Sequence, residues 1–177
     1  MTAELILIVH SARAKARINI LGVFEMKVGT KTKKATAALT GVGKTRRMLL
    51  SDTFLSNFTE DETESVMGHE IGHQVYRHIW KFTVLLTTAF LLMLLIADQV
   101  LRLASAYFGI RSFDTAASLP LLALTLGLLY AGLTPIMNTL SRRAEVHCDQ
   151  YELDLVQKPD AYISAMMKRP ESKVCLP

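Results

Sequence analysis

Two long apolar segments without charged residues most constrain what this 177-residue chain can fold into. They cover residues 82–97 and 115–140. The second exceeds the roughly 20 residues that a helix needs to cross the hydrocarbon core of a bilayer. The first reaches that length if it continues through Asp98 to residue 101, which requires that the helix tilts or that Asp98 lies near the interface. We therefore predict a two-helix transmembrane hairpin, and a pair of buried core helices is the alternative interpretation.

The charges around the hairpin predict its orientation. The connecting stretch, residues 98–114, contains two aspartates and two arginines, so its charges cancel. The outer flanks are basic, with Arg77, Lys81, Arg142 and Arg143. Since basic residues favour the cytoplasmic side, both ends should face the cytoplasm. No sequence typical of a secretory signal occurs at the N-terminus. We expect an integral membrane protein whose polar part contacts the cytoplasm.

The polar part contains the sequence His69-Glu70-Ile71-Gly72-His73, an H-E-x-x-H motif. On a helix, residues four positions apart share a face, so both imidazoles can reach one metal ion. Glu70 follows the first histidine and can act as general base for a bound water. Thr59 and Glu62 fit a capping box that would begin this helix. The motif therefore predicts a metal site, and the alternative is two unrelated helix histidines.

A third ligand is found in a second motif, E-x-x-x-D, formed by Glu145 and Asp149. Glu145 can complete a set of two histidines and one carboxylate that leaves a fourth position open, as in catalytic zinc sites. Asp149 can accept a hydrogen bond from the second ring nitrogen of a liganding histidine. The two cysteines, Cys148 and Cys175, form no competing cluster, and we expect both reduced. The predicted cofactor is one Zn²⁺ ion.

Four further polar residues near the motifs have weaker arguments. His78 lies nine positions after His69, which is the opposite face of a continuous helix, and His147 points away from the metal side of its own helix. Arg142, one turn before the E-x-x-x-D motif, can support an oxyanion or pair with a carboxylate, or equally mark the membrane boundary. Tyr151 is a conceivable oxyanion donor without a spacing argument.

The composition gives no indication of nucleotide or nucleic-acid binding. Residues 43–45, Gly-Lys-Thr, resemble the end of a phosphate-binding loop, but Ala38 stands where that pattern needs its first glycine. The net charge is +4, and two basic clusters, residues 31–34 and 44–47, have no aromatic residues between their charges. We interpret them as a solvated face near anionic lipid headgroups.

The remaining chain predicts a mainly α fold with a small three-stranded sheet. Its expected elements are a helix at 3–21, strands at 23–28, 34–39 and 46–50, and a helix at 160–168.

The chain resembles the membrane zinc metallopeptidases of the CAAX prenyl protease 1 type and the related HtpX proteases. The resemblance rests on HEIGHQVYRH, the membrane hairpin and SRRAEVHCD, and it extends over residues 20–168. The upstream stretch TKKATAALTGVGKTRRMLLSDTFL is also similar, and DTAASLPLLAL favours the CAAX branch. The implied fold is a zincin-like catalytic domain interrupted by a two-helix transmembrane hairpin. We expect one peptidase domain over residues 1–177, divided into 3–81, 82–140 and 141–177.

The resemblance also implies roles for individual residues. Zinc would be held by His69, His73 and Glu145, with Glu70 as catalytic base. Asp149 would support a zinc ligand, and Arg142 is a recurrent site residue. An edge strand would pair with the substrate peptide, and here it is Thr36, Ala37 and Ala38. The family often has asparagine at the position of Thr36, and usually other residues at His147 and Cys148.

The expected activity is hydrolysis of peptide or protein substrates by a metalloendopeptidase. Relatives of the CAAX branch carry several more membrane helices, so a compact version, a fragment and a truncated reading frame remain open. The alternatives are an HtpX-like quality-control protease, a non-catalytic zinc-binding membrane protein, and a soluble zinc peptidase. The sequence indicates no oligomeric state and no cleavage preference.

Overall fold

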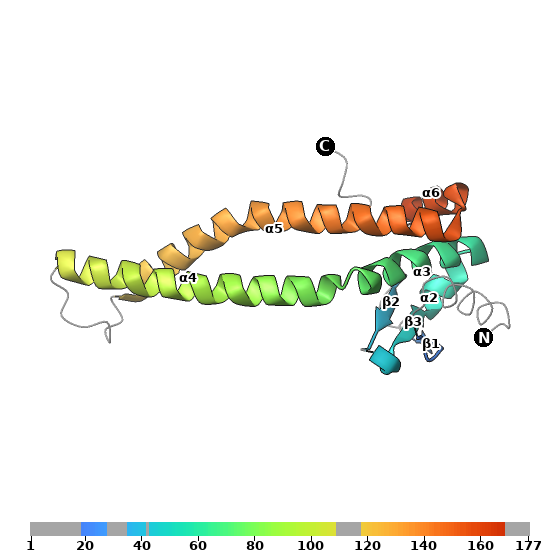
Figure 1. The fold of residues 1–177 in the computed structure, drawn as a ribbon, viewed down its shortest axis with the longest axis horizontal. Helices are drawn as coiled ribbons and strands as arrows, with labels where there is room; N and C mark the ends of the chain where they lie inside the picture. The colour runs from blue at the N-terminus through green and yellow to red at the C-terminus, as the bar shows by residue number, and fades with distance from the viewer. Residues whose placement is uncertain (1–18, 28–34, 42, 109–117, 169–177) are drawn as a thin grey trace. The chain divides into compact units, whose positions relative to one another are not determined.

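The structure is a computed structural model that describes residues 19–27, 35–41, 43–108 and 118–168. It is mainly helical and contains one three-stranded sheet (Figure 1). The predicted mainly α fold with a small sheet is therefore confirmed. The chain divides into two compact units, Met1–Arg77 with Ala144–Pro177, and His78–Arg143. The single domain expected over residues 1–177 stays a prediction.

The sheet belongs to the first unit, and its strand order is β1-β3-β2. Its strands are β1 (Val23–Met26), β2 (Ala37–Thr40) and β3 (Arg47–Ser51). β1 pairs with β3 in parallel, whereas β2 and β3 form the predicted antiparallel hairpin. Gly41 has a φ of 95°, and a Cβ there would lie 2.4 Å from the backbone oxygen of Thr45, so the turn requires glycine. A short 3-10 helix, η1 (Gly43–Thr45), completes the turn.

The N-terminal helix expected over residues 3–21 lies largely outside the described residues, and its last part is wrong. Residues 19–21 are not helical. The amide of Leu21 donates to the carbonyl of Arg46 at 2.8 Å, and the carbonyl of Gly22 accepts from Met48 at 3.0 Å. Hydrogen bonds to the neighbouring strand thus replace those that a helix would have provided.

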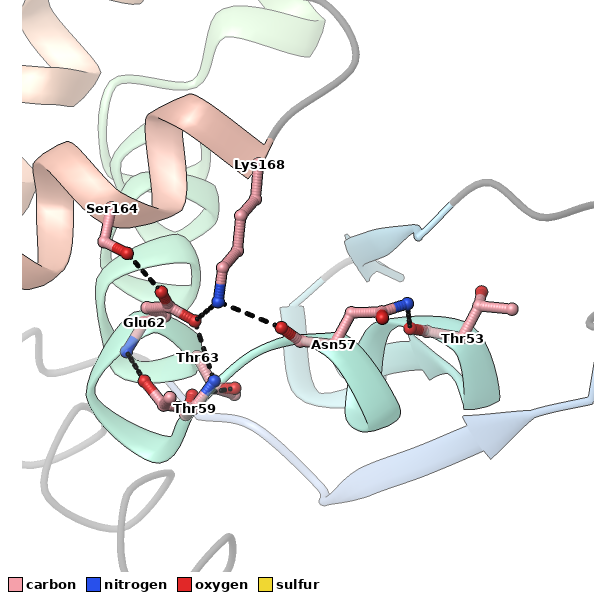
Figure 2. Close-up of polar contacts among 7 residues, drawn as sticks. All are labelled: Thr53, Asn57, Thr59, Glu62, Thr63, Ser164 and Lys168. Carbon is pink, nitrogen blue, oxygen red and sulfur yellow. Dashed lines mark hydrogen bonds and ion pairs between the residues drawn. The ribbon is translucent and has the colours of Figure 1, made fainter.

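Three helices complete the first unit: α2 (Asp52–Asn57), α3 (Glu60–Val75) and α6 (Pro159–Lys168). The predicted capping box begins α3, with the Thr59 amide 2.8 Å from Glu62 Oε2 and the Glu62 amide 3.3 Å from Thr59 Oγ1. The Glu62 carboxylate also accepts from Ser164 and, at 2.7 Å, from Lys168 of α6 (Figure 2). One side chain therefore joins the first turn of α3 to α6.

The environment of Glu62 has a measurable electrostatic consequence. Burial raises the pKa of this carboxyl, but hydrogen bonds from Lys168, Ser164 and Thr59 outweigh burial and lower the pKa to about 2. The ionised form is thus the one that stabilises the start of α3.

The core of the first unit lies where the sheet meets the helices. Met48 and Leu50 of β3 and Met67 and Ile71 of α3 are fully buried, and Phe54 of α2 lies in the same cluster. In α3 these apolar side chains lie on the face toward the sheet, which leaves the other faces for polar residues. The core thereby sets the rotation of α3 about its own axis.

The second unit consists of the helix α4 (His78–Phe108) and the first part of α5 (Leu119–Val156), as far as Arg143, whereas the last part of α5, from Ala144, belongs to the first unit. Both helices are long and apolar enough to cross a membrane, with mean hydropathies of 2.2 and 1.8 in their most apolar windows. Only 6% of either window is buried, unlike the core helices of a soluble domain. The predicted pair of long apolar helices is confirmed. In addition, α5 continues without interruption through the E-x-x-x-D motif, which we had expected on a separate helix.

Candidate metal centre

The candidate site lies where α3 and α5 come close together. A Cβ at Gly72 would lie 3.2 Å from the Cα of Cys148, and one at Gly68 would lie 3.0 Å from a methyl of Val156. Glycine at these two positions, one turn apart, therefore lets the two backbones come close. Each glycine stands next to a histidine of the H-E-x-x-H motif, so the histidines lie at the edge of this contact.

The structure brings together the three predicted metal ligands. His69 Nε2 lies 3.2 Å from Glu145 Oε2 and 3.2 Å from His73 Nε2, and His73 Nε2 lies 3.7 Å from Glu145 Oε1. The side chain of His69 is 4% exposed, whereas those of His73 and Glu145 are 29% and 51% exposed. One ligand is thus buried, and the other two face solvent.

This geometry fits a tetrahedral metal ion. With bonds of about 2.0–2.2 Å, two ligand atoms on neighbouring corners of a tetrahedron lie about 3.4 Å apart. The three observed separations, from 3.2 to 3.7 Å, surround that value. Two imidazole nitrogens and a carboxylate oxygen are also the donors that zinc prefers. The exposed side chains of His73 and Glu145 leave the cluster open to solvent.

The second ring nitrogen of His69 faces carboxylates of α5. His69 Nδ1 lies 2.9 Å from Asp149 Oδ1 and 3.6 Å from Glu152 Oε2. The sequence predicts a hydrogen bond from this histidine to Asp149. The structure places the two atoms at the distance of a hydrogen bond, but the two groups are not aligned for one. Glu152 was missed, although its spacing of seven residues from Glu145 places both on one face of α5.

Glu70 lies on α3 directly after His69, and its side chain is half-buried. It therefore extends from the same turn of helix as the buried ligand.

The edge strand β2 lies beside the motif helix. The side-chain amide of Gln74 in α3 donates to the carbonyl of Leu39 in β2 at 3.4 Å. The amide of Thr36 donates to Ser51 Oγ and its carbonyl accepts from the Ser51 amide, each at 2.9 Å. Since directions alternate along a strand, Ala38 also faces β3, and Ala37 presents its backbone groups to the open edge. Of the three predicted substrate-binding residues, only Ala37 is placed for backbone pairing.

The sequence places four other polar residues near the motifs. Arg142 and His147 are exposed on α5, and no ion pair among the described residues includes Arg142. Tyr151 packs against the core and lies edge-on to Tyr76, at 5.9 Å between ring centroids. The expectation for His78 was wrong: α3 ends at Val75, and His78 is buried at the start of α4. A left-handed Arg77, with a φ of 55°, interrupts the helix between them.

A helix that carries H-E-x-x-H is the arrangement used by metallopeptidases. The family model of Peptidase family M48 matches residues 1–169, and the chain belongs to this family. It is 30% identical over 145 residues to the metalloprotease YhfN of Bacillus subtilis (strain 168), covering 80% of this chain and 34% of that protein. It is 31% identical over 120 residues to the CAAX prenyl protease 1 homolog of Dictyostelium discoideum, covering 65% and 28%. The metallopeptidase class is thereby confirmed.

A solved structure agrees with the fold. The crystal structure of S. mikatae Ste24p superposes with a TM-score of 0.68 at 21% identity, covering 94% of this chain and 43% of that protein. The zincin-like fold with two long apolar helices is thus confirmed. The chain spans about a third of the length of the curated relatives it matches.

Proposed function

We propose that this chain forms the catalytic centre of a membrane-embedded zinc metalloendopeptidase. Zinc would be held by Nε2 of His69, Nε2 of His73 and the carboxylate of Glu145. The observation that carries the proposal is the convergence of the two Nε2 atoms and the two carboxylate oxygens of Glu145, from two helices, at separations of 3.2–3.7 Å. Asp149 orients His69, because its carboxylate lies 2.9 Å from Nδ1 and leaves Nε2 to face the ion.

Glu70 acts as the general base and acid of the reaction. A zinc ion bound at this centre supplies Lewis acidity, which activates a water molecule and the scissile carbonyl. The carboxylate of Glu70 takes the proton of the attacking water and later delivers it to the leaving amine. Its half-buried position next to His69 supports this role, because electrostatic interactions within the site are stronger where water is partly excluded.

The open edge of β2 binds the substrate as an additional strand. Ala37 directs its amide and carbonyl to this edge, and the contact from Gln74 keeps the strand beside the motif helix. An extended peptide paired there would run alongside the helix that carries both histidines. Thr36 and Ala38 would support the strand from the side of β3 and contribute their side chains.

The two apolar helices anchor the centre in the bilayer with its catalytic face toward the cytoplasm. Their exposed apolar side chains need a lipid environment, and the basic residues Arg77, Lys81, Arg142 and Arg143 flank them. Labelling of Ser141→Cys by a membrane-impermeant thiol reagent tests the orientation, since it should require permeabilised cells. Labelling in intact cells would reverse the assignment.

The proposed substrates are prenylated CAAX proteins, because the chain is similar to the CAAX prenyl protease 1 homolog of Dictyostelium discoideum. Quality control of membrane proteins, as in HtpX proteases, is the second candidate. A farnesylated CAAX peptide and an unfolded membrane protein, offered separately to the detergent-solubilised protein, distinguish them. Cleavage of only the unfolded protein would remove the CAAX assignment.

The decisive experiment compares the wild-type protein with Glu70→Gln. Zinc content and cleavage of an unstructured reporter protein are measured for each in detergent. We expect one zinc in both proteins and cleavage only by the wild type. Glu64→Gln is the matched control, because Glu64 lies on the same helix and, among the described residues, its ion pair is with Lys158, at 2.8 Å, so cleavage should persist. Zinc in both proteins without cleavage by either would favour a non-catalytic zinc-binding protein, and no zinc would reject the proposed centre.

A further inference from the structure

A buried carboxylate, Glu152, lies behind the imidazole of His69. Its side chain is 3% exposed, and its Oε2 is 3.6 Å from His69 Nδ1. The hydroxyl of Ser65 in α3 donates to its Oε1. Ser65 and His69 are 1% and 3% exposed, so three polar groups from two helices meet where water has almost no access.

Packing alone does not account for a carboxylate at this position. A carboxylate can accept about four hydrogen bonds, and one hydroxyl leaves much of its desolvation cost uncompensated. An apolar side chain of similar size would fill the same space without that cost. The position of Glu152 is therefore better explained by what its charge does for a neighbour. Besides Ser65, the proton-donating neighbour that the described residues place beside Glu152 is the Nδ1 side of His69.

We propose that Glu152, held in place by Ser65, is a positioning residue that acts together with Asp149 on His69 and raises the affinity of the centre for a divalent metal ion. The inference rests on the proposed zinc site. Two carboxylates on the Nδ1 side favour the tautomer whose Nε2 lone pair faces the ion, and they make that nitrogen a stronger donor. Their charge also attracts a divalent cation through an interior where screening is weak. Asp149 is the closer partner at 2.9 Å, and Glu152 adds the second charge at 3.6 Å.

The test is the zinc affinity of Glu152→Gln, measured by competition with a chelator on the full chain in detergent. Glutamine keeps the size of the side chain and can still accept from Ser65, while the charge is lost. We expect zinc to bind about tenfold or more weakly, the usual effect of removing a partner of a metal ligand. In the chelated protein, Tm should stay the same or rise, because a buried charge has been removed. A purely structural role would instead lower Tm and leave zinc affinity unchanged.

The chain offers a matched control in a second serine–glutamate pair that also joins α3 to another helix. Ser164 of α6 donates to Glu62, far along α3 from the two histidines (Figure 2). Glu62→Gln should lower Tm while zinc affinity stays at the wild-type value. Ser65→Ala provides a second variant of the site that keeps the carboxylate but frees it, and a smaller loss of zinc affinity is expected.

The outcomes separate this inference from the proposed function. Wild-type zinc affinity in both Glu152→Gln and Ser65→Ala would overturn the inference while leaving the zinc site intact. An equal loss of affinity in Glu62→Gln would also overturn it, because a general loss of helix packing would then explain the effect. Failure of the wild-type protein to bind zinc would reject both the proposed function and the role of Glu152. If Glu152→Gln does not fold, Ser65→Ala alone decides by the same criterion.

Discussion

Replacing Gly72 by alanine should weaken zinc binding by about tenfold, or about 1.4 kcal/mol, while the protein still folds. The added methyl would lie 3.2 Å from the Cα of Cys148 and 3.3 Å from its Cβ and Sγ. Carbon atoms in contact prefer about 3.5–4.0 Å, so α5 must move away by a few tenths of an ångström. That displacement exceeds the roughly ±0.2 Å that metal–ligand distances tolerate, and Glu145 moves with α5 while the histidines stay on α3. Overpacking costs about 1–3 kcal/mol, and alanine regains about 0.5–1 kcal/mol of helix propensity, so the net loss of stability is about 0–2.5 kcal/mol.

The assay is competition for zinc between the protein and a chelator, with Tm measured in parallel. Gly132→Ala is the control, because the same substitution in α5 meets nothing within 4 Å and should leave zinc affinity unchanged. Adding Cys148→Gly to Gly72→Ala removes two of the three contacting atoms and should restore part of the affinity. Wild-type affinity in Gly72→Ala would refute the argument that this glycine sets the distance between the ligands of the two helices.

Four further expectations follow from the described contacts. The pKa of Glu62 is lowered from an ordinary 4.5 to about 2, which contributes about 1–3 kcal/mol to the free energy of unfolding. This contribution is present above pH 4.5 and is lost as the pH falls toward 2, so the stability of Glu62→Gln should depend less on pH in acid when unfolding is measured across this range. Thr59→Ala removes the side-chain acceptor of the capping box and should lower the free energy of unfolding by about 1 kcal/mol in urea titrations. Gln74→Ala frees the Leu39 carbonyl, so KM for a peptide substrate should change more than kcat; an unchanged KM would argue against a role for this contact. Removal of zinc by a chelator should lower Tm, and zinc at 100 times its Kd should stabilise by about 2.7 kcal/mol; a Tm indifferent to zinc would contradict the coupling.

Features set by residues close in the chain were predictable from the sequence. The capping box at Thr59 and the common face of His69 and His73 depend only on helix spacing. The β2–β3 hairpin depends on glycines in its turn, and the long apolar helices depend on composition. The grouping of Glu145 with the histidines was also predicted, but from the chemistry of the donors rather than from their distance.

Features set by contacts between distant segments were not predictable. Nothing in the sequence around Arg77 marks a break, because no glycine or proline stands there, and the left-handed residue is visible only in the structure. The role of Glu152 depends on which side of α5 meets α3, which in turn depends on the rotation of both helices and on close packing at Gly68 and Gly72. The seven-residue spacing between Glu145 and Glu152 identifies their common face of α5, but it does not identify His69 as the residue that Glu152 faces.

The charge around the proposed metal centre leads us to expect that helix packing and metal binding depend on each other. Three carboxylates of α5 lie within 3.7 Å of an imidazole nitrogen of α3, and Glu70 extends from the same turn as His69. Like charges this close repel one another, and the repulsion grows as water is excluded. A divalent cation attracts every one of these carboxylates and so offsets the repulsion. Binding of the ion should therefore favour the same close approach of α3 and α5 that Gly68 and Gly72 permit sterically. A substitution that loosens this packing should lower the affinity for the metal, and removal of the metal should loosen the packing.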